Sequence, residues 1–164
     1  MVAFGLGKGG GDDNNGGVTI DSSTPWMAAS EGNLSLLQSS VTSLQLTFNA
    51  ADENGYTLLH AAASYNQLDI LRFLLGSSNQ VNVNAVDNDG DSALHYSTKV
   101  DAARLLIDIG KINPSITNSD GKTALQAKQE EINEMMQDED VDDDDEEMED
   151  LKKLVEYLST LSSS

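Results

Sequence analysis

The feature that most constrains the fold is a short motif that recurs four times at intervals of 33, 35 and 31 residues. Each copy places a Thr or Ser three residues after an Asp or Asn, and three copies have a Gly directly after that Asp or Asn. A unit of this length is too small to bury an apolar face alone. The period therefore predicts a stack of small units, each closing its neighbour's core. The recurring hydroxyl residues are Thr24, Thr57, Ser92 and Thr123.

The second copy shows most clearly what one unit contains. Gly55 can supply the positive φ of a tight turn, and Thr57 is of the residue type that caps helix N-termini. Apolar residues at helical spacing then indicate two short helices, one directly after Thr57 and one from about Gln67 to Gly76. Each unit is therefore predicted to be a helix–turn–helix hairpin.

These units resemble ankyrin repeats, which combine a turn ending in D-x-x-G-x-T-P-L-H-x-A-A with two antiparallel helices and a hairpin finger. The pairs Thr24-Pro25, Leu59-His60 and Leu94-His95 carry the resemblance, which extends over about residues 21–161. It implies an all-α solenoid of about four helix–turn–helix units with hairpin fingers. It also implies that both histidines bridge their own Thr57 or Ser92 to the backbone of a neighbouring repeat.

The remaining sequence divides the chain around these units. The first repeat departs most from the pattern and is predicted to cap the stack, whereas the third is short before its second helix and is predicted to be the weakest. We expect a flexible Gly-rich tail at 1–20, repeats at about 21–49, 50–84, 85–116 and 117–161, an acidic insertion at 138–147 and a short tail at 162–164.

The last helix has two interpretations. Residues 148–161 form an amphipathic pattern in which Leu151, Leu154 and Leu158 share one face. We expect this helix to be the second helix of the last repeat, closing the apolar end of the stack. The alternative is a free helix that docks into a partner's groove.

The charge distribution restricts the possible partners. The net charge is −19, and residues 130–150 contain 14 of the 28 acids and no base. Phosphate backbones require Lys and Arg, so neither nucleic acid nor an anionic membrane is an expected partner. Cysteine is absent, the apolar runs are short, and the first residues lack the features of a secretory signal. We therefore expect a cytoplasmic or nuclear location.

No pattern in the sequence predicts catalysis, a cofactor or a metal site. The G-x-G-x-x-G match at 5–10 neither follows a strand nor opens a helix. The calcium-loop spacing that begins at Asp138 has Asp143 where the loop requires glycine. The two histidines have no base or orienting partner beside them in the sequence, so their structural role is the expected one. We therefore expect a non-enzyme.

The resemblance implies a protein–protein interaction module, such as an adaptor or scaffold, that binds through finger tips and inner helices. The expected binding positions carry nearly balanced charges, and we expect Tyr56 and Tyr65 to be the anchors. The alternative is a chaperone or escort of a basic client, such as a ribosomal protein, in which the acidic insertion covers the client's cations. We expect a monomer. The expected partner-binding residues are Glu53, Tyr56, Tyr65, Val86, Asn88, Asp91, Lys99 and Lys122.

Overall fold

The computed structural model describes residues 19–76, 78–137 and 145–162. Most of the predicted flexible tail at 1–20 and most of the acidic insertion lie outside these residues, as do the two matches at 5–10 and near Asp138. Within the described residues the chain forms eight α-helices and no strand longer than an isolated bridge. The helices are α1 (Thr24–Glu31), α2 (Leu34–Ser43), α3 (Leu58–Ser64), α4 (Leu68–Leu74), α5 (Ala93–Tyr96), α6 (Val100–Asp108), α7 (Ala124–Met135) and α8 (Glu146–Leu161).

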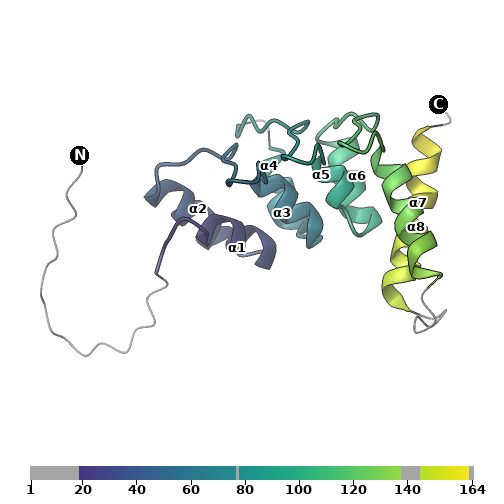
Figure 1. Cartoon of the computed structure of the whole chain (residues 1–164). Coiled ribbons are helices and arrows are strands. Elements are labelled where there is room, and N and C mark those ends of the chain that lie inside the picture. The colour runs from purple at the N-terminus through teal and green to yellow at the C-terminus, as the bar shows by residue number, and fades with distance from the viewer. Residues whose placement is uncertain (1–18, 77, 138–144, 163–164) are drawn as a thin grey trace, which may run out of the picture.

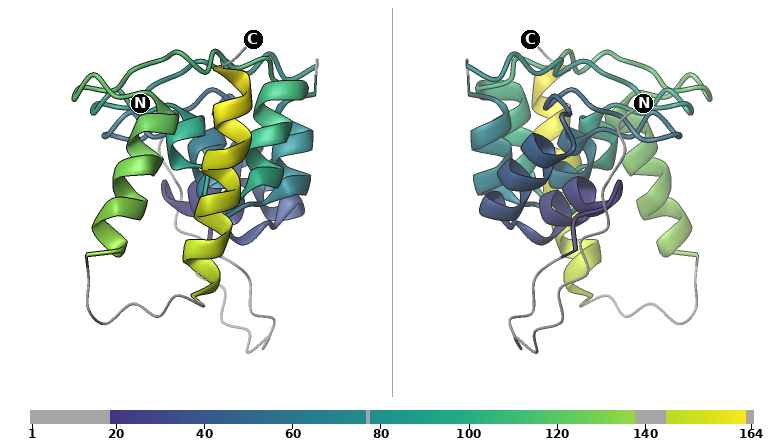
Figure 2. Two further views of the ribbon diagram at one scale, coloured as in Figure 1. Left: turned by 90° about the vertical axis from the view of Figure 1, so that its right-hand side faces the viewer. Right: turned by 90° about the vertical axis from the view of Figure 1, so that its left-hand side faces the viewer.

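The helices stack as consecutive pairs along one direction (Figure 1). Helices α1, α3, α5 and α7 contact one another in sequence and form an inner row. Helices α4, α6 and α8 form an outer row against it, and the end-on views show the connecting loops along one edge of the helices (Figure 2). This arrangement confirms the predicted solenoid of helix–turn–helix units.

Local capping explains where three of the inner helices begin. The Thr57 side chain accepts a hydrogen bond from the His60 amide, and the His60 ring accepts one from the Thr57 amide. Ser92 with His95, and Thr123 with Gln126, form the same reciprocal capping box. Helix α1 differs, because Thr24 is its first residue and donates its hydroxyl hydrogen to Asp21 Oδ1 at 3.1 Å instead.

The fingers between the pairs are built on one repeated turn. Asp52 Oδ1 accepts hydrogen bonds from the amides of residues 54 and 56, and Asp87 and Asn118 do the same in the next two fingers. Gly55, Gly90 and Gly121 close these turns at φ values of 74°, 81° and 73°, as predicted. An isolated antiparallel bridge pairs the two sides of each finger, at 51–57, 86–92 and 117–123.

Neighbouring fingers are also joined by their backbones. The Asn88 amide donates to Asn54 O, and the Ser119 amide donates to Asp89 O, both at 2.8 Å. Each finger therefore lies at a fixed distance from the next.

Two parts of the stack depart from the regular repeat. Helix α5 has only four residues, in agreement with the missing residues after His95. Helix α8 begins at Glu146, two residues before the predicted start, and packs against α6 and α7. Its Leu154 and Leu158 are buried in the same core cluster as Leu106 of α6. This packing agrees with the capping interpretation of the last helix.

Candidate protein-binding face

The fingers and the inner helices form the face on which the expected binding residues lie. Four of these residues are exposed: Glu53 on the first finger, Tyr65 at the C-terminal end of α3, and Val86 and Asn88 on the second finger. Tyr65 is 63% exposed and Val86 is 44% exposed. They are large apolar groups in contact with solvent.

Two of the expected binding residues, Asn88 and Asp91, already have partners inside the protein. Asn88 donates its side-chain amide to Glu53 O at 3.1 Å, and the Asp91 carboxylate accepts from the Asn118 side chain at 2.9 Å. Both bonds connect one finger to its neighbour. These two side chains therefore help to hold the fingers in register.

The expected anchor Tyr56 belongs to an aromatic cluster. Its ring centroid lies 5.0 Å from that of Tyr96 in an edge-on arrangement, and His60 lies 5.4 and 5.5 Å from the two tyrosines. Tyr56 is half-buried and precedes α3, whereas Tyr65 caps the other end of that helix. The two expected anchors thus lie at opposite ends of α3, and the more exposed one is Tyr65.

Tyr96 is a member of this cluster that the sequence reasoning missed. Its hydroxyl donates to Asp87 Oδ2 at 2.7 Å. Burial, followed by this bond to a carboxylate, raises the pKa of the Tyr96 phenol, and burial likewise raises the pKa of Tyr56. The sequence does mark Tyr96 as unusual, because the equivalent position in the other three repeats is alanine, at Ala28, Ala61 and Ala127.

The histidines have the bridging role that the resemblance implied. His60 Nδ1 lies 2.7 Å from Thr57 Oγ1, and its Nε2 lies 3.0 Å from Asp91 O in the next repeat. Since Nδ1 accepts the Thr57 amide, Nε2 carries the hydrogen that Asp91 O accepts. Burial lowers the pKa of His60, in keeping with this neutral ring. His95 makes the equivalent contacts with Ser92 and with Lys122 O.

The two lysines among the expected binding residues are paired with acids of the last repeat. Lys99 Nζ lies 2.8 Å from Asp150 and 3.9 Å from Glu146 of α8, and Lys122 forms an ion pair with Glu130 of α7. Hydrogen bonds to these carboxylates raise the pKa of both lysines. From the sequence, the expected binding residues have a net charge near zero. In the structure their two lysines are already neutralised by acids outside the face, so the charge that the face presents is more negative than expected.

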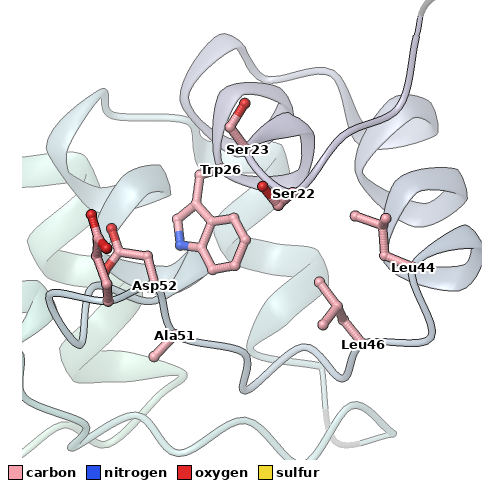
Figure 3. A pocket seen from close by; sticks show the side chains of 8 residues that line it. Ser22, Ser23, Trp26, Leu44, Leu46, Ala51 and Asp52 are labelled. Atoms are coloured by element: carbon pink, nitrogen blue, oxygen red, sulfur yellow. The ribbon is translucent and has the colours of Figure 1, made fainter. Parts of the chain in front are cut away.

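A groove lies at the N-terminal end of the same face, beside the first finger (Figure 3). We call it the Trp26 groove. The Trp26 indole is half-buried and donates Nε1–H to Tyr56 O at 2.8 Å, so packing inside the protein covers only part of its surface. The groove has a volume of about 670 Å³ and is lined by Ser22, Ser23, Trp26, Leu44, Leu46, Ala51, Asp52 and Glu53.

Two kinds of feature are absent from the described residues. Across 19–76, 78–137 and 145–162, no three His, Asp or Glu side chains are grouped so that they could hold a metal ion. Over the same residues, no helix is both long enough and apolar enough to cross a membrane.

The helix pairs, bridged histidines and linked fingers define a helical-repeat protein with one finger-bearing face. Residues 25–118, more than half of the chain, match the family model for ankyrin repeats in three copies. The chain therefore belongs to the ankyrin-repeat family. Repeats of this family generally mediate protein–protein interaction.

Several known proteins are similar to the repeat region. An ankyrin repeat-containing protein of Schizosaccharomyces pombe, P1E11.10, is 36% identical over 109 residues, which cover 65% of this chain and 51% of that protein. NF-kappa-B inhibitor delta of Mus musculus is 31% identical over 62% of this chain and 31% of its own length. The E3 ubiquitin-protein ligase hecd-1 of Caenorhabditis elegans is 29% identical over 63% of this chain, but only 4% of the ligase is covered. The chain thus spans about half of the fission-yeast relative and much less of the others.

Proposed function

We propose that this chain is a non-catalytic protein-binding module, of the adaptor or scaffold type, and that its partner is basic. The face formed by the fingers and inner helices would bind this partner. One observation carries the choice of a basic partner: Lys99 and Lys122 are both engaged by carboxylates of α7 and α8. The outward-facing groups that remain on this face include the exposed Glu53, Asp89 and Tyr65.

The physical reason is that charge complementarity selects partners and increases the rate of encounter. A face that presents tyrosines and unpaired carboxylates attracts Lys and Arg and repels phosphate. The proposal therefore includes neither nucleic acid nor membrane as a partner. It also includes a monomeric state, a cytoplasmic or nuclear location, and no bound cofactor.

The escort of a basic client, such as a ribosomal protein, is a narrower form of the same proposal. It adds a role for the acidic insertion, whose residues 138–144 lie outside the described part of the chain. The composition of residues 130–150, with 14 acids and no base, supports it. An escort of this kind would lose its client at high salt, because ions screen exposed charges beyond about 10 Å at 0.1 M.

The test is affinity capture with the tagged full-length chain, followed by binding kinetics on the captured protein. We expect a basic protein to be retained at low salt and released at high salt. Tyr65→Ala should then raise the off-rate about ten-fold, because exposed tyrosines concentrate binding energy at interfaces. Lys152→Ala, an exposed change on α8, is the control and should leave the off-rate unchanged. An acidic partner, or equal off-rates for the two variants, would contradict the proposal.

A further inference from the structure

The Trp26 groove is a concavity that shares only Glu53 with the expected partner-binding residues. Its volume of about 670 Å³ falls within the range of side-chain and small-molecule sites. Figure 3 shows the Trp26 ring at the centre of this concavity, with Leu44 and Leu46 on one side and Asp52 on the other. The groove therefore has an apolar wall, an aromatic surface and an acidic wall.

The two acids of the groove have different freedom to bind a ligand. Asp52 uses Oδ1 to accept the amides of Asn54 and Tyr56, at 2.8 and 2.9 Å, and no bond inside the described chain engages its Oδ2. The Glu53 side chain is exposed and makes no hydrogen bond or ion pair with the described residues. A cation in the groove could therefore approach two carboxylates without breaking the finger turn.

The stretch of sequence that contributes the groove residues contains no Lys or Arg. Between residues 9 and 71 there is not one Lys or Arg, whereas Asp21, Glu31, Asp52, Glu53 and Asp69 fall in this range. The first repeat and the second repeat as far as residue 71 thus carry only negative formal charges, and the following Arg72 is paired with Asp69. This charge pattern is complementary to a basic ligand.

Arginine is the side chain that fits all three walls. Its planar guanidinium stacks on aromatic rings and forms paired hydrogen bonds with carboxylates, while its aliphatic stem packs on apolar groups. Tryptophan is the ring on which a cation is held most strongly. The chain already uses this chemistry internally, since the Arg104 guanidinium lies 5.2 Å from the centre of the Tyr157 ring.

We propose that the Trp26 groove binds an arginine side chain of a basic protein partner, at the N-terminal end of the finger face. The inference rests on the proposed function, from which it takes the basic partner. It adds a specific residue type and a place: the guanidinium lies over the Trp26 indole, towards Asp52 and Glu53.

The experiment uses the fluorescence of Trp26, which is the sole tryptophan of the chain. The probe is a capped peptide of alternating Arg and Gly, and its matched control replaces each Arg by citrulline, which has nearly the same shape but no charge. We expect the Arg peptide to change the Trp26 emission in a saturable way and the citrulline peptide to have no effect. An equal response to both peptides would overturn the inference.

Substitutions separate the groove from the general acidity of the chain. Glu53→Gln should weaken the fluorescence-detected binding about two- to five-fold, in line with one exposed charge pair. Adding Asp52→Asn, which keeps an oxygen for the turn amides, should bring the loss to about ten-fold. Glu147→Gln is the matched control at the start of α8 and should have no effect. If it weakens binding as much as Glu53→Gln, the peptide is held by overall charge and the inference is wrong.

Three further outcomes distinguish competing explanations. If Lys8→Gln changes the Trp26 emission of the chain without peptide, the groove is filled by the chain's own N-terminal segment, which overturns the proposed occupant. If a basic partner is retained through Tyr65 while Glu53→Gln and the Trp26 signal show nothing, the groove inference fails and the proposed function stands. If no basic protein is retained, both fail.

Discussion

At the scale of single residues, His60 links two repeats through one ring. Its Nδ1 completes the capping box of α3, and its Nε2 donates to Asp91 O of the following repeat. The ring is 1% exposed, so water cannot replace either bond. We therefore expect its removal to affect folding and not chemistry.

His60→Ala should lower the free energy of unfolding by about 1–3 kcal/mol, because it leaves buried backbone groups without a partner. His60→Gln is the informative comparison, since Gln126 already fills the same capping position in the fourth repeat. The Gln variant should lose less stability than the Ala variant. Denaturant-induced unfolding of both variants provides the measurement, and equal losses would contradict the role assigned to the cap.

The lowered pKa of His60 also predicts a pH dependence. The unfolded chain has the ordinary histidine pKa of 6.5, while burial lowers the folded pKa of His60, so the unfolded state binds more protons below that value. The contribution of the neutral ring is therefore complete above about pH 6.5 and is lost as the pH falls below it. Unfolding measured at about pH 7.5 and about pH 5.5 should show this loss in the wild type and a smaller loss in His60→Gln.

At the scale of elements, the finger turns provide an internal comparison. A Cβ on Gly90 would lie 3.0 Å from both Asn118 Cα and Ser119 N of the next finger, whereas a Cβ on Gly121 would meet nothing within 4 Å. Both glycines have positive φ, so both substitutions introduce the same backbone strain. The difference between them isolates the close packing of adjacent fingers.

We expect Gly121→Ala to cost about 1 kcal/mol of unfolding free energy through backbone strain alone. Gly90→Ala should cost about 1–3 kcal/mol more, because the following finger must shift. Thermal or denaturant unfolding of the two variants tests this. Equal losses of unfolding free energy would contradict the close packing of adjacent fingers that the structure shows.

The last helix is the other element with a clear test. Leu154 is fully buried where α8 meets the core, so Leu154→Ala should lower the unfolding free energy by about 2–5 kcal/mol. Lys152→Ala, on the exposed side of the same helix, should change it by no more than about 0.5 kcal/mol. If the two variants unfold alike, α8 does not cap the stack in solution, and its alternative role as a ligand for a partner's groove is favoured.

At the scale of the whole molecule, charge is distributed unevenly along the stack. No Lys or Arg occurs from residue 9 to 71, and the acids Glu130, Glu146 and Asp150 lie at the opposite end of the stack, on α7 and α8. These acids also neutralise Lys99 and Lys122 on the binding face. A basic partner would therefore meet negative charge at both ends of the stack.

Replacing residues 138–147 by a short Gly/Ser linker should mainly slow the association with a basic partner. We expect about a ten-fold lower on-rate at low salt and a weaker salt dependence, because long-range attraction accelerates encounter. The off-rate should change little. Stopped-flow association at two salt concentrations measures this, with an unchanged unfolding transition as the control. An unchanged on-rate at low salt would show that the insertion does not contribute to association.

The sequence by itself determined the repeat architecture, because its signals are local. A Gly with positive φ, a Thr or Ser that caps a helix and a histidine three residues later act within one turn of chain, so Gly55, Thr57 and His60 could be interpreted without knowledge of the fold. The alternation of two short helices followed from apolar spacing in the same way. Only details at the ends differed, such as the earlier start of α8 at Glu146.

The tertiary structure decided which side chains remain available on the binding face. Lys99 meets Asp150, about fifty residues away, and Lys122 meets Glu130 only because α7 and α8 close the stack. Tyr96 contacts Tyr56 because the inner helices of adjacent repeats pack side by side. The Trp26 groove forms where helix α1 of the first repeat lies beside the finger that leads into the second repeat. Such contacts depend on how repeats pack, and no local pattern encodes that packing.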